Sequence, residues 1–310
     1  MLQFLVLNED LQKVAITELG EKPSRISDDI IALKTWIVKQ PHLKARTDDQ
    51  FLIQFLRGCK FSLEKAKQKL DMFYAMKTKC SELFGITDVD DITFRKIHNT
   101  GTFVPLPIPL NGCGPRIIFY RCNYDAKDFT VEQVSQYMTA IHEVAMISDP
   151  YACVYGLCYV VDLSQLTLQH ALTLTPTHLK KFLEFFENTM PIRVKSLTVI
   201  NLSPAAEYLQ RLVFSCFPEK IQKRIFICGR NFTDISAHIP LKYLPREYGG
   251  ENGSLPQVIE DNNKIWDKYR SYFEQNANYG SNERLRYGKS MNFDDELGVS
   301  GGSFRKLDVD

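Results

Sequence analysis

The sequence contains no hydrophobic run long enough to cross a lipid bilayer. Its longest apolar stretch, PYACVYGLCYVV at residues 150–161, ends at Asp162, whereas a helix needs about 20 apolar residues to span the hydrocarbon layer. The first ten residues, MLQFLVLNED, have neither a basic start nor a small-residue cleavage site for a signal peptidase. We therefore expect a cytoplasmic protein.

The eight cysteines include no C-x-x-C pair and follow no regular spacing. A chain of 310 residues can bury a core without disulfides, so we expect reduced thiols. Paired C-x-x-C motifs and an H-E-x-x-H motif, which would indicate zinc, are also missing. The sequence predicts no metal and no cofactor.

An excess of one charge is missing as well, since 38 basic residues balance 37 acidic ones to a net charge of +1. This balance argues against a protein that binds nucleic acid with its whole surface. Residues 191–224 depart from it, with two acidic residues against six basic ones: Arg193, Lys195, Arg211, Lys220, Lys223 and Arg224. The cluster is either an anion site or a solvated charged surface.

Motifs of common enzyme classes are absent. In NGCGPRI the third glycine of a dinucleotide motif is replaced by Ile117, and the glycines precede a strand instead of following it. YGKS has Glu283 where a phosphate loop needs glycine, and no G-x-S-x-G occurs. Asp162 ends a predicted strand, where a carboxylate more often caps a turn than catalyses. We predict that the protein is not an enzyme; the remaining enzymatic hypothesis pairs Asp162 with His142 or His170.

The periodicity of apolar residues changes near residue 90. Before it, helical spacing dominates, as at Ile26, Ile30, Leu33 and Ile37. After it, predicted strands at 116–120, 155–164, 195–201 and 224–228 alternate with predicted helices at 130–148, 175–190 and 203–217. This α/β pattern predicts a mainly parallel sheet with crossover helices. We expect a helical lobe over 1–90, an α/β lobe over 91–255, and a C-terminal helix with a weakly ordered tail over 256–310.

The predicted helix at 203–217 has two interpretations. Its apolar positions recur every three to four residues, which suits an ordinary crossover helix that covers the sheet. However, Leu157, Tyr159 and Val161 share one strand face, and the neighbouring helices add aromatic side chains, including Tyr137 and Phe182. One helix would have to cover many large side chains on this face. The second interpretation is therefore that the face lines a cavity.

Several stretches resemble the CRAL-TRIO lipid-transfer family over about residues 25–275. They are, in order, FLIQFLRGCKFSLEKAKQKL, VVDLSQLTLQHALTLTP, PIRVKSLTVIN, EKIQKRIFICG and LPREYGG. The resemblance is greatest to the tocopherol- and retinaldehyde-binding members, and the tail GGSFRKLDVD resembles that of invertebrate members. It implies a helical N-terminal lobe and an α/β lobe that encloses an apolar pocket under a mobile lid helix, here 201–218.

The function implied by the resemblance is that of a carrier. It would bind one small hydrophobic ligand, such as a retinoid, tocopherol, carotenoid or similar prenyl lipid, and exchange it during transient contact with phosphoinositide-containing membranes. We expect it to act as a monomer. The alternative is a protein that exchanges or senses phospholipids or phosphoinositides, which would need cationic and hydroxyl groups inside the mouth of the pocket.

The resemblance also assigns residues. The ligand pocket would be lined by Tyr137, Met138, His142, Leu157, Tyr159, Val161, Leu168, Phe182, Phe185, Phe186, Ile192 and Leu197, some of which are alternatively plain core. The lid would present Leu202, Ala206, Leu209, Val213 and Phe217. Phosphoinositides would bind Arg57, Arg193, Lys195, Lys220 and Arg224.

Two of the pocket positions depart from the tocopherol-binding pattern. Met138 and His142 stand where small hydroxyl residues are expected, and phenylalanines crowd residues 182–186. A rod-like or bent polyene is therefore at least as good a candidate as tocopherol. His142 would hydrogen-bond either a ligand hydroxyl or carbonyl, or a backbone carbonyl in the core.

Overall fold

The computed structural model describes residues 4–202, 207, 213–214, 217–228, 232–288 and 291. Most of the predicted helix at 203–217 lies outside these residues, including Ala206 and Leu209 of the predicted lid. The end of the C-terminal tail also lies outside them. Leu202 is described and is half-buried directly after a strand.

The N-terminal lobe is helical, as predicted from its apolar spacing. One helix carries all four predicted apolar residues on its buried face: Ile26, Ile30, Leu33 and Ile37. Asn8 caps the first helix, because its side-chain oxygen accepts a hydrogen bond of 2.8 Å from the Leu11 amide. The elements are α1 (Glu9–Leu19), α2 (Ile26–Val38), β1 (Leu43–Lys44), α3 (Asp49–Gly58), α4 (Leu63–Lys79), α5 (Ser81–Phe84) and α6 (Ile92–Thr100).

The second lobe is built on a sheet that, in the described residues, has five strands in the order β2-β3-β4-β5-β6. The first pair is antiparallel and the other three pairs are parallel, which confirms the mainly parallel α/β fold. The strands are β2 (Phe103–Pro105), β3 (Arg116–Arg121), β4 (Leu157–Asp162), β5 (Val194–Ile200) and β6 (Ile225–Ile227).

The two faces of the sheet face different cores. Ile118 and Tyr120 pack with α7 and the N-terminal helices, whereas Ile117 and Phe119 pack against residues 235–259. The helices of this lobe are α7 (Val131–Ser148), α8 (Pro150–Val154), α9 (Leu168–Thr173), α10 (Pro176–Glu184), α12 (Glu219–Gln222) and α13 (Phe232–Ser236). Helix α10 ends earlier than predicted, because a π turn replaces the α-helix over Phe185–Thr189.

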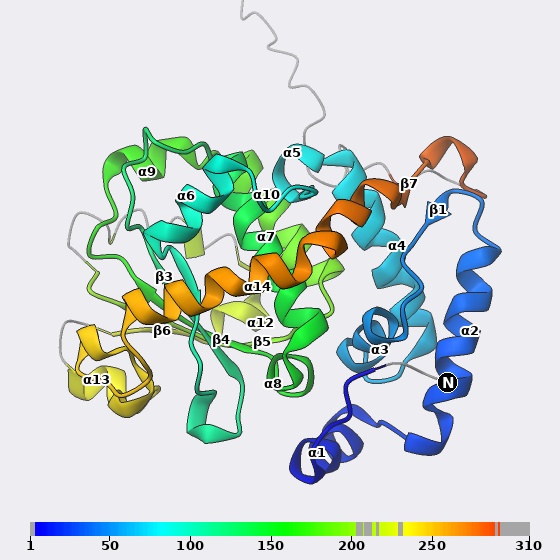
Figure 1. Cartoon of the computed structure of the whole chain (residues 1–310), viewed down its shortest axis with the longest axis horizontal. Helices are drawn as coiled ribbons and strands as arrows, with labels where there is room; N and C mark the ends of the chain where they lie inside the picture. Colours follow the sequence, from blue (N-terminus) through cyan, green and yellow to red (C-terminus); the bar gives the residue numbers. More distant parts are fainter. Residues whose placement is uncertain are drawn as a thin grey trace, which may run out of the picture.

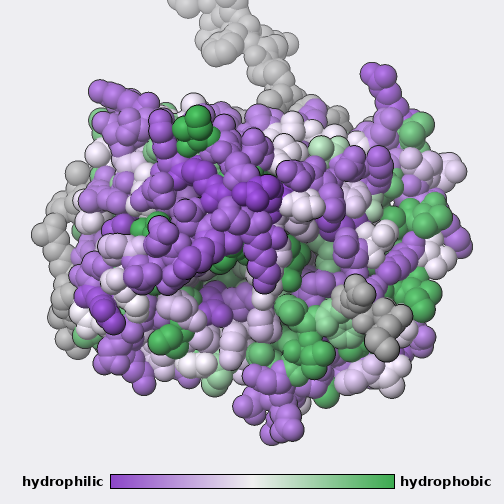
Figure 2. All heavy atoms as spheres, in the orientation of Figure 1, coloured by the Kyte–Doolittle hydropathy of each residue, from purple (hydrophilic) through white to green (hydrophobic). Residues whose placement is uncertain are grey.

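The long C-terminal helix α14 (Leu255–Gln275) runs across the second lobe toward the first (Figure 1). Trp266 and Phe273 are buried, while the outer surface over α14 is largely hydrophilic (Figure 2). Strand β7 (Gly280–Ser281) then pairs antiparallel with β1, and Arg286 forms an ion pair with Asp71. The expectation of a weakly ordered tail is therefore wrong for residues 276–286, which the N-terminal lobe holds in place.

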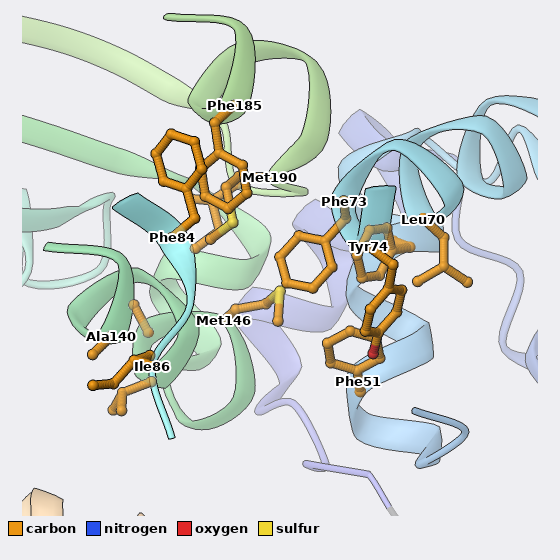
Figure 3. Packing of buried hydrophobic residues seen from close by; sticks show 14 of the residues in the cluster. Phe51, Leu70, Phe73, Tyr74, Phe84, Ile86, Ala140, Met146, Phe185 and Met190 are labelled. Carbon is orange, nitrogen blue, oxygen red and sulfur yellow. The ribbon is translucent and has the colours of Figure 1, made fainter. Parts of the chain in front are cut away.

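Phe185 joins the two lobes in one continuous core (Figure 3). Its ring stacks on Phe84 of α5 with the centroids 4.0 Å apart, and lies 6.0 Å from Phe73 of α4. All three rings are buried. The π turn that carries Phe185 is thus anchored in the helical lobe.

No helix among the described residues is long and apolar enough to cross a membrane.

Truncating Phe185 should destabilise the whole protein. We expect Phe185→Ala to lower the free energy of unfolding by about 3–5 kcal/mol, because the cavity it leaves lies between the two lobes. Leu172→Ala, at a side chain that is 72% exposed, should change it by less than about 0.5 kcal/mol. Chemical denaturation measures both, and equal effects of the two variants would contradict the interlobe core.

Candidate functional site

A cavity of about 410 Å³ lies on the sheet face that packs toward the helical lobe. Its walls come from strands β3 to β5, from helices α7, α9 and α10, and from Val213, Phe214, Phe217 and Ile221. This volume falls within the range of small-molecule binding sites. Most of the described lining residues are apolar or aromatic, and no lysine or arginine is found among them.

Seven of the twelve predicted pocket residues line this cavity: Met138, His142, Tyr159, Val161, Phe182, Phe186 and Leu197. From the predicted lid, Val213 and Phe217 also line it, whereas Leu202 does not. Strand alternation accounts for Tyr159 and Val161, and the helical repeat accounts for Met138 and His142, which are four residues apart on α7.

The other five predicted pocket residues lie elsewhere. Tyr137 points away from Met138 and hydrogen-bonds His98 at 3.0 Å, because successive residues on a helix differ in direction by about 100°. Leu157, Phe185 and Ile192 are buried in the core shared with the helical lobe. Leu168 is 65% exposed on the outer side of α9. The prediction that these five line the pocket is corrected accordingly.

Several lining residues were not predicted from the sequence, although simple periodicity places them on the same faces as the predicted ones. Tyr120 and Cys122 follow Ile118 at alternate positions of β3 and its extension, and both line the cavity. Ser135 precedes Met138 by three residues and His142 by seven, so it shares their helical face. The Ser135 side chain is buried, and its hydroxyl has no hydrogen-bond partner among the described residues.

His142 and Tyr159 form the polar pair in the cavity wall. The Nδ1 atom of His142 lies 2.6 Å from the carbonyl oxygen of Met138, and its Nε2 atom is hydrogen-bonded to the Tyr159 hydroxyl. Burial lowers the pKa of His142 to about 4 and raises the pKa of Tyr159 above its usual range. Both side chains are therefore uncharged at neutral pH.

The groups of the enzymatic hypothesis are occupied by structural hydrogen bonds. The carboxylate of Asp162 accepts from the Ser164 amide at 2.8 Å and from the Tyr248 hydroxyl. The Nε2 atom of His170 donates to the Tyr124 carbonyl oxygen at 3.0 Å. Asp162 thus serves as a turn cap, as its position at a strand end indicates. The described residues also contain no cluster suited to a metal ion.

Three of the predicted cations gather at the start of β5. Burial lowers the pKa of both Arg193 and Lys195. The nearby charge of Arg224 lowers each pKa further. Glu18 of α1 is the acidic neighbour, with 3.9 Å between its carboxylate and the Lys195 ammonium. Neighbouring cations repel one another, and a bound anion would relieve this repulsion.

The predicted cations are next in sequence to residues that line the cavity. Val194, between Arg193 and Lys195, lines the cavity, and so does Ile221, next to the exposed Lys220. Lys69 of α4, which the sequence analysis missed, lies near enough to Lys220 that the two charges interact. Its ammonium donates to the carbonyl oxygen of Glu187 at 2.8 Å.

Arg57 does not belong to the basic surface. Its side chain is 1% exposed and donates to the buried carboxylate of Glu21 at 2.8 Å. A buried, paired guanidinium cannot reach a lipid head group, so the prediction for Arg57 is wrong. The sequence around Arg57 could not show this, because its partner Glu21 lies in the segment that connects α1 to α2.

Two family models match the chain. The CRAL/TRIO domain matches residues 111–250, which contain the sheet and the cavity, and the Pinta-like UBA domain matches residues 22–94 of the helical lobe. Residues 111–250 therefore form a CRAL-TRIO domain. This confirms the family resemblance and places the protein in a family of lipid-binding and transfer proteins.

Curated relatives agree with this assignment. Clavesin-2 of Homo sapiens is 28% identical over 244 residues, covering 78% of this chain and 74% of clavesin-2. Alpha-tocopherol transfer protein-like of Mus musculus is 28% identical over 255 residues, covering 80% and 72%. The crystal structure of Sfh5 aligns at 11% identity with a TM-score of 0.47, covering 82% of this chain and 92% of that one, a match too distant to bear on the site.

The buried, neutral His142 should make stability depend on pH. Its pKa of about 4 in the folded protein lies below the value of about 6.5 in an unfolded chain. The unfolded state therefore binds the proton first, and stability falls as the pH drops from about 6.5 to about 4. Between pH 7 and pH 5, the wild-type protein should lose about 2 kcal/mol more unfolding free energy than His142→Phe.

Urea denaturation of both proteins at the two pH values measures this difference, and the comparison cancels the contributions of all other titrating groups. Parallel losses in the two proteins would show that His142 is protonated equally in its folded and unfolded states.

Proposed function

We propose that this CRAL-TRIO protein is a non-enzymatic carrier that binds one small apolar molecule, such as a retinoid, carotenoid or other prenyl lipid, in the cavity. It acts in the cytoplasm and exchanges its ligand at membranes that contain phosphoinositides. The observation that carries the proposal is a cavity of about 410 Å³ whose described wall is largely apolar and holds no lysine or arginine.

The energetics suit a carrier. A ligand that buries roughly 400 Å² of apolar surface gains on the order of 10 kcal/mol, from which several kcal/mol are lost to immobilisation. Such a ligand stays bound in water and needs a membrane to leave. Val213, Phe214, Phe217 and Ile221 line one part of the cavity, and we propose that this part opens for exchange.

The basic residues beside the cavity support a membrane encounter. Arg193, Lys195, Lys220 and Arg224 contribute on the order of 1 kcal/mol each at an anionic surface. The resulting dissociation constant, roughly millimolar, suits a reversible contact that the multivalent charge of a phosphoinositide would strengthen.

The alternative, exchange of phospholipids, requires cationic groups that converge on a phosphate inside the cavity. Among the described lining residues, the one with a formal charge at neutral pH is the acidic Glu187. Burying a phosphate there would leave its charge without a counter-ion in an apolar wall. The carrier is therefore favoured.

The ligand class can be tested directly. Delipidated protein is incubated with a total lipid extract, and the complex is analysed by native mass spectrometry and by extraction. We expect one small apolar molecule per chain. One phospholipid per chain would establish the alternative, and failure to retain any lipid would contradict the carrier.

Phe186 should be important for holding the ligand. It lines the cavity, whereas its neighbour Phe185 does not. The centroid of the Phe186 ring lies 4.8 Å from that of the His142 ring. We expect Phe186→Ala to weaken retention of the extracted ligand by at least about tenfold, because a large apolar contact is lost. Unchanged retention in a variant with a normal unfolding transition would assign Phe186 to the core.

The basic group should determine membrane binding without affecting the ligand. We expect Lys195→Glu with Lys220→Glu to weaken sedimentation with phosphoinositide vesicles by at least about tenfold and to leave ligand retention unchanged. Arg224 is avoided because it donates to the Val194 carbonyl oxygen.

The matched control is Lys264→Glu with Lys268→Glu, which makes the same change in net charge at exposed sites on α14. Equal sedimentation of the two double variants would remove the docking site from the proposal.

A further inference from the structure

Two polar side chains in the cavity wall have proton positions that their neighbours determine. His142 comes from α7 and Tyr159 from β4, and both line the cavity. Their side chains are joined by a hydrogen bond between His142 Nε2 and the Tyr159 hydroxyl. The direction of that bond decides what the pair offers to a ligand.

The backbone fixes the direction. The carbonyl oxygen of Met138 can only accept a hydrogen bond, so the His142 Nδ1 atom, 2.6 Å away, carries the ring proton. Burial keeps the ring neutral at physiological pH. A neutral ring with its proton on Nδ1 has a bare Nε2 atom, which must accept. The Tyr159 hydroxyl therefore donates its proton to His142.

Tyr159 is left with acceptor capacity only. Its single hydroxyl proton is engaged by His142, and no donor to its oxygen is found among the described residues. Its pKa is raised by burial, so the hydroxyl stays protonated and the oxygen uncharged. A ligand that reaches this oxygen is met by lone pairs.

We infer that the cavity selects an apolar ligand with a hydroxyl or N–H donor, such as a prenyl or polyene alcohol, over the corresponding aldehyde or hydrocarbon. The inference rests on the proposed function, because it concerns which apolar molecule the carrier accepts. An alcohol donates to Tyr159, whereas an aldehyde oxygen opposes its lone pairs and a hydrocarbon leaves the buried oxygen unpaired.

Ser135 does not reverse this selection. Its unpartnered hydroxyl lies on the same helical face of α7 as His142, seven residues earlier, which corresponds to about 10 Å along the axis. A serine hydroxyl rotates freely and both donates and accepts. It therefore accommodates either kind of polar group and does not oppose the selection that the His142–Tyr159 pair makes.

The test is a competition between two ligands with the same skeleton. Delipidated full-length protein is mixed with equal amounts of geranylgeraniol and geranylgeranial, and the non-covalently bound fraction is extracted after gel filtration and quantified. We expect about tenfold more alcohol than aldehyde on the wild-type protein, which corresponds to one unpaired buried polar group.

Two variants separate the hydrogen bond from a merely structural effect. His142→Phe removes the acceptor and frees the Tyr159 proton, so the preference should shift toward the aldehyde. Tyr159→Phe removes the oxygen, so the two compounds should bind about equally. Tyr137→Phe is the matched control, because it deletes a buried tyrosine hydroxyl of α7 outside the cavity and should keep the wild-type ratio.

The outcomes distinguish the inference from the function on which it rests. Equal retention of alcohol and aldehyde by the wild-type protein, or a preference that His142→Phe leaves unchanged, would overturn the inference while the carrier stands. Retention of neither compound would contradict the carriage of prenyl lipids, and the inference with it. Each variant is scored only with an intact unfolding transition, and Tyr159→Phe and His142→Phe test the pair independently.

Discussion

The position of helix α7 is determined by a buried carboxylate, and the cavity depends on that helix. Glu143 is 1% exposed and accepts hydrogen bonds from Lys77 of the helical lobe, and from Tyr272 at 3.0 Å and Asn276 at 3.2 Å at the end of α14. Removing a partner from a buried charge is costly, so three distant parts of the chain are held together here. His142, the preceding residue of α7, points in a different direction and lines the cavity. The contacts of Glu143 therefore help to position this part of the cavity wall.

Polar groups near the cavity are used in two different ways. Asp162 and His170 form structural hydrogen bonds with a turn amide and a backbone carbonyl oxygen. Two of the predicted cations, Arg193 and Lys195, are half-buried and have Glu18 as an acidic neighbour. An apolar interior next to a basic border suits a protein that meets a charged surface and passes an uncharged molecule.

Much of the fold followed from the sequence, because apolar periodicity reports directly on which residues are buried. The alternation of strands and helices after residue 90 predicted the parallel sheet, and alternate residues of β4 predicted Tyr159 and Val161 in the cavity wall. The wrong predictions concern single residues whose neighbours in space do not follow from the spacing along the chain. Tyr137 and Leu168 have the composition of pocket residues, but one turns toward His98 and the other toward solvent. The early end of α10 and the ordered segment at 276–286 depend on partners more than 90 residues away.

The sequence by itself determined the class of the molecule: an α/β lobe after a helical lobe, an apolar face on the sheet, and a group of cations near it. These properties are local, since they depend on spacing along one segment. Only the tertiary structure decided that Arg57 is neutralised by Glu21 and that the Tyr159 proton points at His142. The reason is physical, because charge and hydrogen-bond direction depend on which groups meet in space, and the residues concerned lie 36 and 17 positions apart.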